Sequence, residues 1–273
     1  MKEKTIIKQL LSLCSLLLTV IPLISSATVY TLYDEKQNNL PDDQTWLAYY
    51  AKDGSAIPNN ITNGVQLVTD TPASAGYSNY SLLPVPGIKN PTFPVLDSSI
   101  GFTLSFNMWL HKESHTGNDN RAGFSIILLD SNHQGVELGF WEDSIWSQSA
   151  NPLFTAKDEE EAFNTTASML AYDLTLLNNN YYLTHNDIIL LEGALKDYSA
   201  FNGPLGSLPY SLSNYLFLGD DTSSAAADVT LGRIELSDTA LFTVPSPSTP
   251  LLISLGLLSL LRFSSRNSSK AAL

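Results

Sequence analysis

Two glutamates, Glu137 and Glu142, lie five residues apart in a stretch that reads Glu-Leu-Gly-Phe-Trp-Glu. A pair of carboxyl groups about 5 Å apart can hydrolyse a glycosidic bond, one acting as nucleophile and the other as acid and base. On a regular strand, residues five apart face opposite sides of the sheet, so a bulge is needed to bring the two together. The spacing therefore keeps glycoside hydrolysis as one alternative.

Three side chains that commonly ligate metals alternate along another segment: His111, Glu113 and His115. If the backbone stays extended, all three project from one face, and two imidazoles with a carboxylate suit a divalent ion such as zinc. A zinc site also needs a further ligand and ordered partners behind it. The alternatives are an exposed strand end, or pairing of Glu113 and His115 with Arg121 across the intervening loop.

A second ion site is suggested by Asp220 and Asp221, which precede Thr222. Carboxylate and hydroxyl oxygens are ligands that calcium accepts, so calcium is the alternative to the expectation that the protein has no cofactor. The same residue types also cap turns by bonding to nearby backbone groups. Turn capping is therefore the alternative role for this pair.

Aromatic side chains could build a platform on which a sugar ring stacks, because each combines a large apolar face with a polar edge. The aromatic candidates are Trp109, Phe140, Trp141, Trp146, Tyr198 and Phe201. The predicted ligand-binding residues are Trp141, Trp146, Tyr198 and Arg121. Because side chains on a strand alternate between two faces, about half of the aromatic candidates are expected to be core residues instead.

Strands must position these residues, because no segment between residues 28 and 243 sustains a helical apolar period while several alternate with period two. The longest predicted strand covers residues 100–110, with apolar side chains at even positions. Further strands are predicted at 122–129, 136–141, 172–177, 181–184, 188–192, 215–218 and 229–236, separated by turns of Gly, Asn and Asp. The acidic segment 158–163 is either a short helix or a solvated loop. This pattern predicts an all-β fold, a single jelly-roll β-sandwich over residues 28–243.

The charge of the chain is unevenly distributed. Its 273 residues carry 14 basic and 27 acidic side chains, for a net charge of −13. Residues 28–243 alone hold 8 basic and 26 acidic side chains, or −18, whereas both ends are basic. This charge opposes binding to a phosphate backbone or to an anionic membrane surface. The composition therefore argues against nucleic acid as a partner and favours a cation as any bound ion.

The N-terminus has the order of parts of a secretory signal peptide. Three lysines among the first eight residues precede an apolar run over residues 10–24, which ends in Ser25, Ser26 and Ala27. We therefore predict a signal peptide over residues 1–27, removed by signal peptidase. A permanent span is the alternative, but Pro22 and the shortness of the run against the roughly 20 residues of a span oppose it. Cys14 is the only cysteine, so its removal leaves no disulfide or thiol chemistry.

The C-terminal residues 244–273 combine a Pro245-Ser246-Pro247 motif, an apolar run over 251–261 that predicts a short helix, and a basic end. That run is too short to cross a bilayer core of about 30 Å comfortably. The order of parts resembles the PEP-CTERM sorting signals of bacteria, with Ser246 where that family has Glu. The resemblance implies processing by an exosortase-like sorting protease and delivery to the cell surface or extracellular matrix. A plain membrane tail is the alternative.

Several stretches of the body resemble the bacterial choice-of-anchor Y domain; they include residues 75–78, 101–106, 120–125, 137–141, 197–200 and 217–222. This resemblance implies one surface domain, of no established molecular function, joined to varying C-terminal anchors. The meander over 172–193 is similar in architecture to laminin-G and concanavalin-like sandwiches. The stretch from Glu137 to Glu142 is similar to the Glu-x-Asp-x-x-Glu pattern of laminarinase-like glucanases, with Gly139 in place of the Asp.

Taken together, these features predict an exported cell-surface or extracellular-matrix protein, held transiently or permanently in a membrane by its C-terminal segment. Its β-sandwich is expected to be a non-enzymatic interaction domain for a glycan or a matrix polymer. Two alternatives stay open. One is a retaining glycoside hydrolase that uses Glu137 and Glu142, and the other is a structural matrix component without a ligand.

Overall fold

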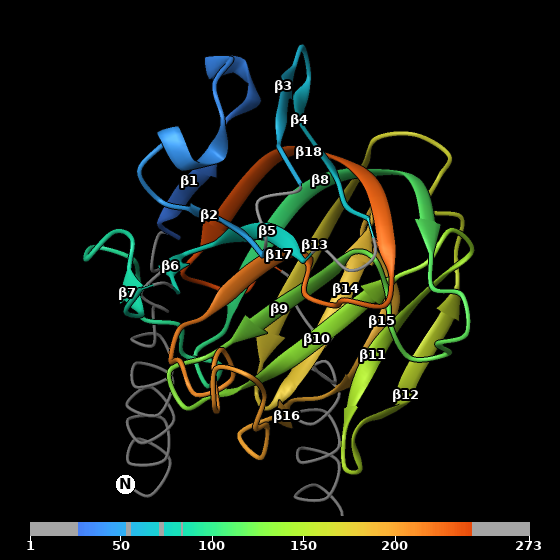
Figure 1. Cartoon of the computed structure of the whole chain (residues 1–273). Coiled ribbons are helices and arrows are strands. Elements are labelled where there is room, and N and C mark those ends of the chain that lie inside the picture. The colour runs from blue at the N-terminus through green and yellow to red at the C-terminus, as the bar shows by residue number, and fades with distance from the viewer. Residues whose placement is uncertain (1–26, 53–55, 71–73, 83, 242–273) are drawn as a thin grey trace, which may run out of the picture.

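The computed structural model describes residues 27–52, 56–70, 74–82 and 84–241 of the chain (Figure 1). Residues 1–26 of the predicted signal peptide lie outside the described residues, as does the whole predicted sorting segment 244–273 with its helix at 251–261. Within the described ranges, no helix is long and apolar enough to cross a membrane.

Two antiparallel sheets of eight strands each form the sandwich, which confirms the predicted all-β jelly-roll fold. Along sheet A the strands follow the order β15 (Ile188–Ala194), β14 (Asn180–His185), β13 (Leu170–Leu177), β8 (Phe102–Ser114), β18 (Ala226–Ser237), β4 (Gly64–Val68) and β3 (Asn59–Ile61), with β1 (Val29–Tyr33) also paired to β18. In Figure 1, β8 and β18 run side by side as the two longest arcs of this sheet.

Sheet B lies against sheet A. Its strands follow the order β12 (Leu153–Ala162), β11 (Ser144–Ala150), β10 (Gln134–Phe140), β9 (Ser125–Leu129), β17 (Leu216–Asp220), β5 (Ala75–Ser78) and β2 (Ala48–Ala51), with β16 (Lys196–Asp197) also paired to β10. The remaining short elements are the hairpin β6 (Tyr80–Ser81) and β7 (Gly87–Ile88), and the 3₁₀ turns η1 (Glu35–Gln37) and η2 (Pro41–Asp43).

The main core fills the space between the two sheets. Along β8, the even-numbered side chains from Phe102 to Leu110 are buried, as the alternation in the sequence predicts. Phe106 stacks on Tyr172 of β13 with ring centroids 5.2 Å apart, and meets Phe140 of β10 edge-on at 6.3 Å. Each such side chain contributes roughly 1.5–3 kcal/mol by leaving water.

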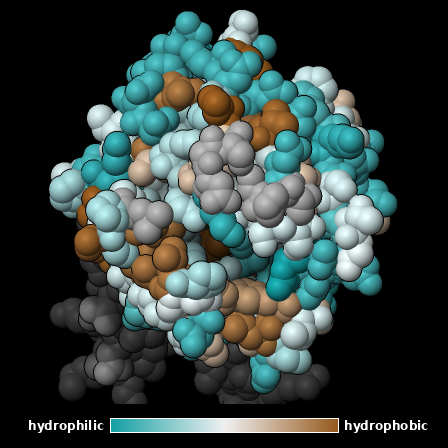
Figure 2. Space-filling model, viewed as in Figure 1, coloured by the Kyte–Doolittle hydropathy of each residue, from teal (hydrophilic) through white to brown (hydrophobic). Residues whose placement is uncertain are grey.

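A second apolar layer covers the outer face of sheet B, where the chain between residues 195 and 215 folds back over it. Side chains from this segment pack on outward-facing residues of β9 and β17; the buried members are Leu82, Ile127, Leu129, Tyr198, Tyr210, Tyr215 and Phe217. Both faces of β9 are therefore buried, and its sequence reads as a continuous apolar run. In the view of Figure 2, hydrophobic residues gather in separate patches, and hydrophilic residues cover most of the upper and right-hand parts.

A β-bulge interrupts β8 at His111. Leu110 pairs with Val229 and Lys112 pairs with Asp228, so two steps on β8 match one step on β18 and His111 has no paired residue. The bulge reverses the alternation, because Glu113 is buried where a regular strand would expose it. This change of phase separates the residues of the predicted metal site.

The acidic segment 158–163 is neither a helix nor a loop, so both expectations for it were wrong. Residues 158–162 form the end of β12, the outermost strand of sheet B, and pair with β11. Because an edge strand leaves much of its surface in water, consecutive acidic side chains can occupy it at a small desolvation cost, and the partly buried Glu159 is paired with Lys196.

Gly139 lies on the outer face of β10, directly beneath the indole of Trp146 on the paired strand β11. A Cβ atom at position 139 would lie 2.5 Å from ring carbon Cζ2 of Trp146, so the Asp of the glucanase pattern does not fit here. We expect Gly139→Ala to lower the free energy of unfolding by about 2 kcal/mol, because Trp146 must shift. Urea denaturation measures this loss. Gly87→Ala is the matched control, because a Cβ there meets nothing within 4 Å; equal stability of the two variants would contradict the prediction.

Candidate functional site

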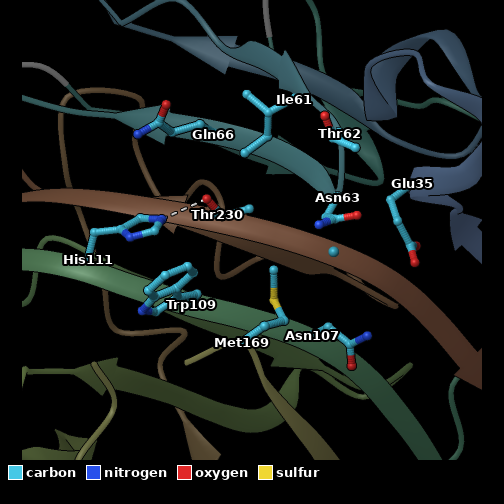
Figure 3. A pocket seen from close by; sticks show the side chains of 11 residues that line it. Glu35, Ile61, Thr62, Asn63, Gln66, Asn107, Trp109, His111, Met169 and Thr230 are labelled. Carbon is cyan, nitrogen blue, oxygen red and sulfur yellow. Dashed lines mark hydrogen bonds between the residues drawn. The ribbon is translucent and has the colours of Figure 1, made fainter. Parts of the chain in front are cut away.

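A groove of about 590 Å³ crosses the outer face of sheet A, where β8, β18 and β4 lie side by side. Side chains from these strands, from the β3–β4 hairpin and from η1 point into it (Figure 3). The lining residues are Glu35, Ile61, Thr62, Asn63, Gln66, Asn107, Trp109, His111, Met169, Thr230 and Gly232. The groove therefore combines one large aromatic side chain with several polar ones.

Trp109 presents its ring in this groove. Its side chain points away from the core because it occupies an odd position of β8, and 37% of the residue is exposed. The indole Nε1 donates a hydrogen bond of 3.0 Å to the carbonyl oxygen of Thr166. The His111 ring lies beside it, with centroids 4.2 Å apart and planes inclined by 44°. These contacts fix the orientation of an aromatic surface that stays open to a ligand.

Polar groups surround Trp109 on the neighbouring strands. The amides of Asn63 and Asn107 have no hydrogen-bond partner among the described residues. Neither has the carboxylate of Glu35, whose Oε2 is buried and whose Oε1 stays open. Gln66 donates from Nε2 to Asp228 Oδ1 at 2.8 Å. His111 Nε2 and Thr230 Oγ1 lie 2.8 Å apart, as the dashed line in Figure 3 marks. The groove thus keeps donors and acceptors available beside an exposed ring.

The predicted metal group is split by the bulge in β8. His111 faces the groove, whereas Glu113 turns inward and His115 follows it, so the expectation that all three share one face was wrong. Glu113 Oε2 lies 2.6 Å from His115 Nδ1, and Glu113 Oε1 accepts from the Gly123 N–H at 3.1 Å. Burial raises the pKa of Glu113, while these hydrogen bonds oppose the rise.

The loop after β8 is closed by stacking. The His115 ring lies parallel to Trp141 with centroids 3.8 Å apart. Arg121 does not pair with Glu113 or His115 as proposed; its Nη1 donates to the carbonyl oxygens of Asn120 at 2.7 Å and Phe154 at 3.1 Å. Within the described ranges, no group of three or more His, Cys, Asp or Glu side chains is placed to hold a metal ion.

Glu137 and Glu142 have different hydrogen-bond partners among the described residues. Glu137 is 7% exposed on the outer face of β10, where its Oε2 accepts a hydrogen bond from the Tyr210 hydroxyl. Glu142 lies in the turn after β10, where its Oε1 accepts from the Glu113 N–H at 3.1 Å. The bulge that the glucanase pattern requires would lie within β10, but β10 pairs with β9 without a shift of register from Gly135 to Gly139.

Glu137 instead meets two other predicted site residues, Arg121 and Asp221, in a pocket of about 260 Å³ on the outer face of sheet B. Asp221, just after β17, has exposed surface within this pocket. Asp220 points the other way and is fully buried, with its Oδ1 accepting from the Thr222 N–H and hydroxyl at 2.9 Å. The turn-capping alternative therefore describes Asp220.

The three predicted aromatic ligand-binding residues are mostly buried. Trp141 is 9% exposed, Trp146 1% and Tyr198 0%. Lys157 Nζ lies 4.0 Å from the ring centroid of Trp141 and covers that ring, whereas the ring of Trp109 is open. Trp109 is one of the aromatic candidates from the sequence, but the amides around it are not among the predicted site residues. Alternation marks Trp109 as outward-facing, and no signal along the chain joins Asn63 and Glu35 to it, because distant segments supply them.

No protein-family model and no curated protein matches the chain. Among solved structures, a conserved carbohydrate esterase from Shiga toxin-encoding bacteriophage phi24B is 12% identical, with 78% of this chain and 100% of that chain covered and a TM-score of 0.48. A protein of unknown function with a galectin-like fold from Bacillus subtilis is 8% identical, with 79% and 99% covered and a TM-score of 0.47. Domain 4 of AbnA, a GH43 extracellular arabinanase from Geobacillus stearothermophilus in complex with arabinotriose, is 11% identical, with 80% and 96% covered and a TM-score of 0.45. At such identities the function must be argued from this chain's own residues.

Proposed function

We propose that this protein is an exported surface or matrix protein whose β-sandwich binds a glycan chain in the groove at Trp109, without catalysing a reaction on it. The observation that supports this most is the exposed Trp109 ring, held in place by Thr166 and flanked by amide and carboxylate groups that have no hydrogen-bond partner in the described part of the chain. A groove open along a sheet suits a chain of sugars better than a compact small molecule.

The chemistry of the groove matches that of a sugar ring. One face of a pyranose is lined by C–H groups, which pack against the indole face, and its hydroxyls both donate and accept hydrogen bonds. The amides of Asn63 and Asn107 supply both kinds of partner, and Glu35 supplies an acceptor. Placing a few polar groups around an aromatic floor is the usual means by which a site fixes orientation.

Export is supported by the sequence ends. The proposed partners are signal peptidase at residues 1–27 and an exosortase-like protease at residues 244–273, with retention at the cell surface or in the matrix. A non-enzymatic role is favoured because Glu137 and Glu142 lie in different environments: Glu137 accepts from the Tyr210 hydroxyl, whereas Glu142 accepts from the Glu113 N–H.

Trp109→Ala should weaken glycan binding about 30-fold, because a buried-on-binding tryptophan typically contributes about 2 kcal/mol. The measurement starts with a glycan array, run with calcium and with chelator, followed by calorimetry on the best ligand. Ile188→Ala, which removes an exposed apolar side chain from another strand of sheet A, should leave affinity unchanged. Absence of any bound glycan would favour a structural component without a ligand, and equal affinity of Trp109→Ala and the wild type would mean that the glycan binds outside this groove.

A further inference from the structure

The pocket on the outer face of sheet B lies on the other sheet from the Trp109 groove and has different chemistry. It holds two carboxyl groups, Glu137 and Asp221, beside the guanidinium of Arg121. Hydroxyl-bearing residues 222–224 form one side, and the aromatic residues Phe154, Phe201 and Tyr210 form the other. None of these groups lines the glycan groove, so the pocket is a separate candidate site.

Glu137 is the most informative member of the pocket. It is more than nine-tenths buried, yet no donor among the described residues reaches its Oε1, while Oε2 is occupied by the Tyr210 hydroxyl. Burial, followed by the neighbouring charge of Asp221, raises the pKa of Glu137 well above its ordinary value. Because Oε1 has no donor from the described residues and is open to the pocket, a ligand that supplies a donor and a positive charge is favoured.

Arg121 does not satisfy this requirement. Among the described residues it forms no ion pair with Glu137 or Asp221, because its Nη1 is held by the carbonyl oxygens of Asn120 and Phe154. Its Cζ lies 5.9 Å from the ring centroid of Phe154, so it forms part of the wall. The carboxyl groups therefore keep room for a second donor.

The aromatic wall suits a cation. Phe154 and Phe201 each contact Tyr210, with ring centroids 5.1 and 5.0 Å away, so the three rings form one surface next to the carboxyl groups. Aromatic faces attract ammonium groups, and they also pack against the C–H groups of a small ring. The net charge of −18 over residues 28–243 draws cations to this surface.

We propose that this pocket binds a protonated amine carried on a small polar molecule, with an unacetylated amino sugar as the simplest example: the ammonium group donates to Glu137 and Asp221, the ring packs on the aromatic wall, and residues 222–224 bond its hydroxyls. A bare divalent ion fits less well, because calcium needs six to eight oxygen ligands and Arg121 repels it. An anionic ligand is opposed by both carboxyl groups. This inference does not depend on the Trp109 groove.

The pH dependence follows from the groups that line the pocket: Glu137 on β10, Asp221 after β17, Arg121 before β9, and Tyr210 from the covering segment. The Tyr198 hydroxyl lies behind them and accepts a hydrogen bond from the Glu137 N–H. Burial raises the pKa of Glu137, and the neighbouring charge of Asp221 adds to this rise. An ammonium ion stabilises the ionised carboxylates, so binding should release protons and be tighter at pH 7 than at pH 5.

The test is the melting temperature of the purified full-length protein with glucosamine, glucose, N-acetylglucosamine, methylamine or calcium chloride, each against potassium chloride at equal ionic strength. Glucosamine should raise the melting temperature by several degrees, methylamine by less, and glucose and N-acetylglucosamine should not. Glu137→Gln keeps an oxygen for the Tyr210 hydroxyl and should abolish the shift, whereas Trp109→Ala should retain it. If Glu137→Gln fails to fold, Asp221→Asn at the exposed member of the pair gives the same readout.

Three outcomes would overturn the proposal. Equal shifts with glucose and glucosamine would show that the pocket recognises hydroxyls and not the ammonium group. A larger shift with calcium that is lost in Glu137→Gln would show a metal site. No shift with glucosamine or methylamine at 100 mM would show that no amine binds. Loss of glycan binding in Trp109→Ala bears on the groove alone, so failures of the two proposals are distinguishable.

Discussion

Lys196→Met should lower the free energy of unfolding by about 3 kcal/mol. Lys196, on β16, is 8% exposed, and its Nζ lies 2.6 Å from Glu159 Oε2 and 3.5 Å from Asp158 Oδ2. Glu159 Oε2 also accepts hydrogen bonds from the Tyr181 hydroxyl at 2.9 Å and from the Ser147 hydroxyl. Because Tyr181 belongs to sheet A and the others to sheet B, this cluster joins the two sheets at one edge.

The size of the loss follows from what the substitution leaves behind. Methionine keeps most of the apolar stem but removes the ammonium group, so the Glu159 carboxylate remains partly buried without its cation. Breaking a buried ion pair in this way costs about 3–5 kcal/mol. The Glu159 side chain is 30% exposed, so water reaches it and the lower end of that range applies.

Urea denaturation of Lys196→Met against Lys112→Met, an exposed lysine on β8, isolates the effect. The double variant Lys196→Met/Glu159→Gln should recover part of the loss, because no uncompensated charge remains. Burial opposes ionisation of Glu159, but hydrogen bonds from Lys196 and Ser147 hold its pKa below the ordinary value. Its stabilising contribution is therefore present above about pH 4.5 and lost in acid, so the variant and wild type should converge there. A double variant no more stable than the single one would contradict this account.

Asp220→Asn should stabilise the protein at neutral pH by about 2 kcal/mol, because the gain from removing the titrating carboxyl is partly offset by burying an amide NH2 where Oδ2 has no partner among the described residues. Burial raises the pKa of Asp220 to about 8, although hydrogen bonds from Thr222 and Thr69 oppose the rise. The folded state therefore holds this carboxyl protonated where the unfolded chain ionises it. Stability from this group is fully present below about pH 4 and is lost progressively as the pH rises toward 8.

The asparagine variant removes that dependence, since its side chain does not titrate and its oxygen can still accept from Thr222. The measurement is the free energy of unfolding at about pH 5, 6, 7 and 8 for the variant and the wild type. Their difference should grow with pH. A pH-independent difference at position 220 would mean that Asp220 ionises normally in the folded protein.

The strands were predictable where one face is buried and the other is exposed to solvent. β8 alternates clearly from Phe102 to Leu110, so its residues and their faces follow from period two. β9 is buried on both faces, and its continuous apolar run predicts a strand. That run does not reveal which segment covers the outer face, so the covering segment was not predicted. The prediction for residues 158–163 was wrong because four consecutive acidic residues indicate a helix or a loop, whereas an edge strand such as β12 accepts them equally well.

The sites were less predictable, because each depends on contacts between distant segments. The bulge at His111 leaves no signature in the sequence, yet it separates His111 from Glu113. Trp146 and Tyr198 are predicted ligand-binding aromatics, but other parts of the chain cover them. The pocket that holds Arg121, Glu137 and Asp221 joins three predicted site residues that were assigned to three different roles.

The acidic edge of β12 has a consequence for how molecules of this protein behave when crowded. A strand edge offers unpaired backbone donors and acceptors, and a second copy could extend the sheet across it into a fibril. Asp158, Glu159, Glu160 and Glu161 lie in sequence on this edge, so a second copy paired there would bring carboxylates against carboxylates. The edge therefore resists growth of a continuous sheet, and neutralising these four residues should make the protein prone to polymerise.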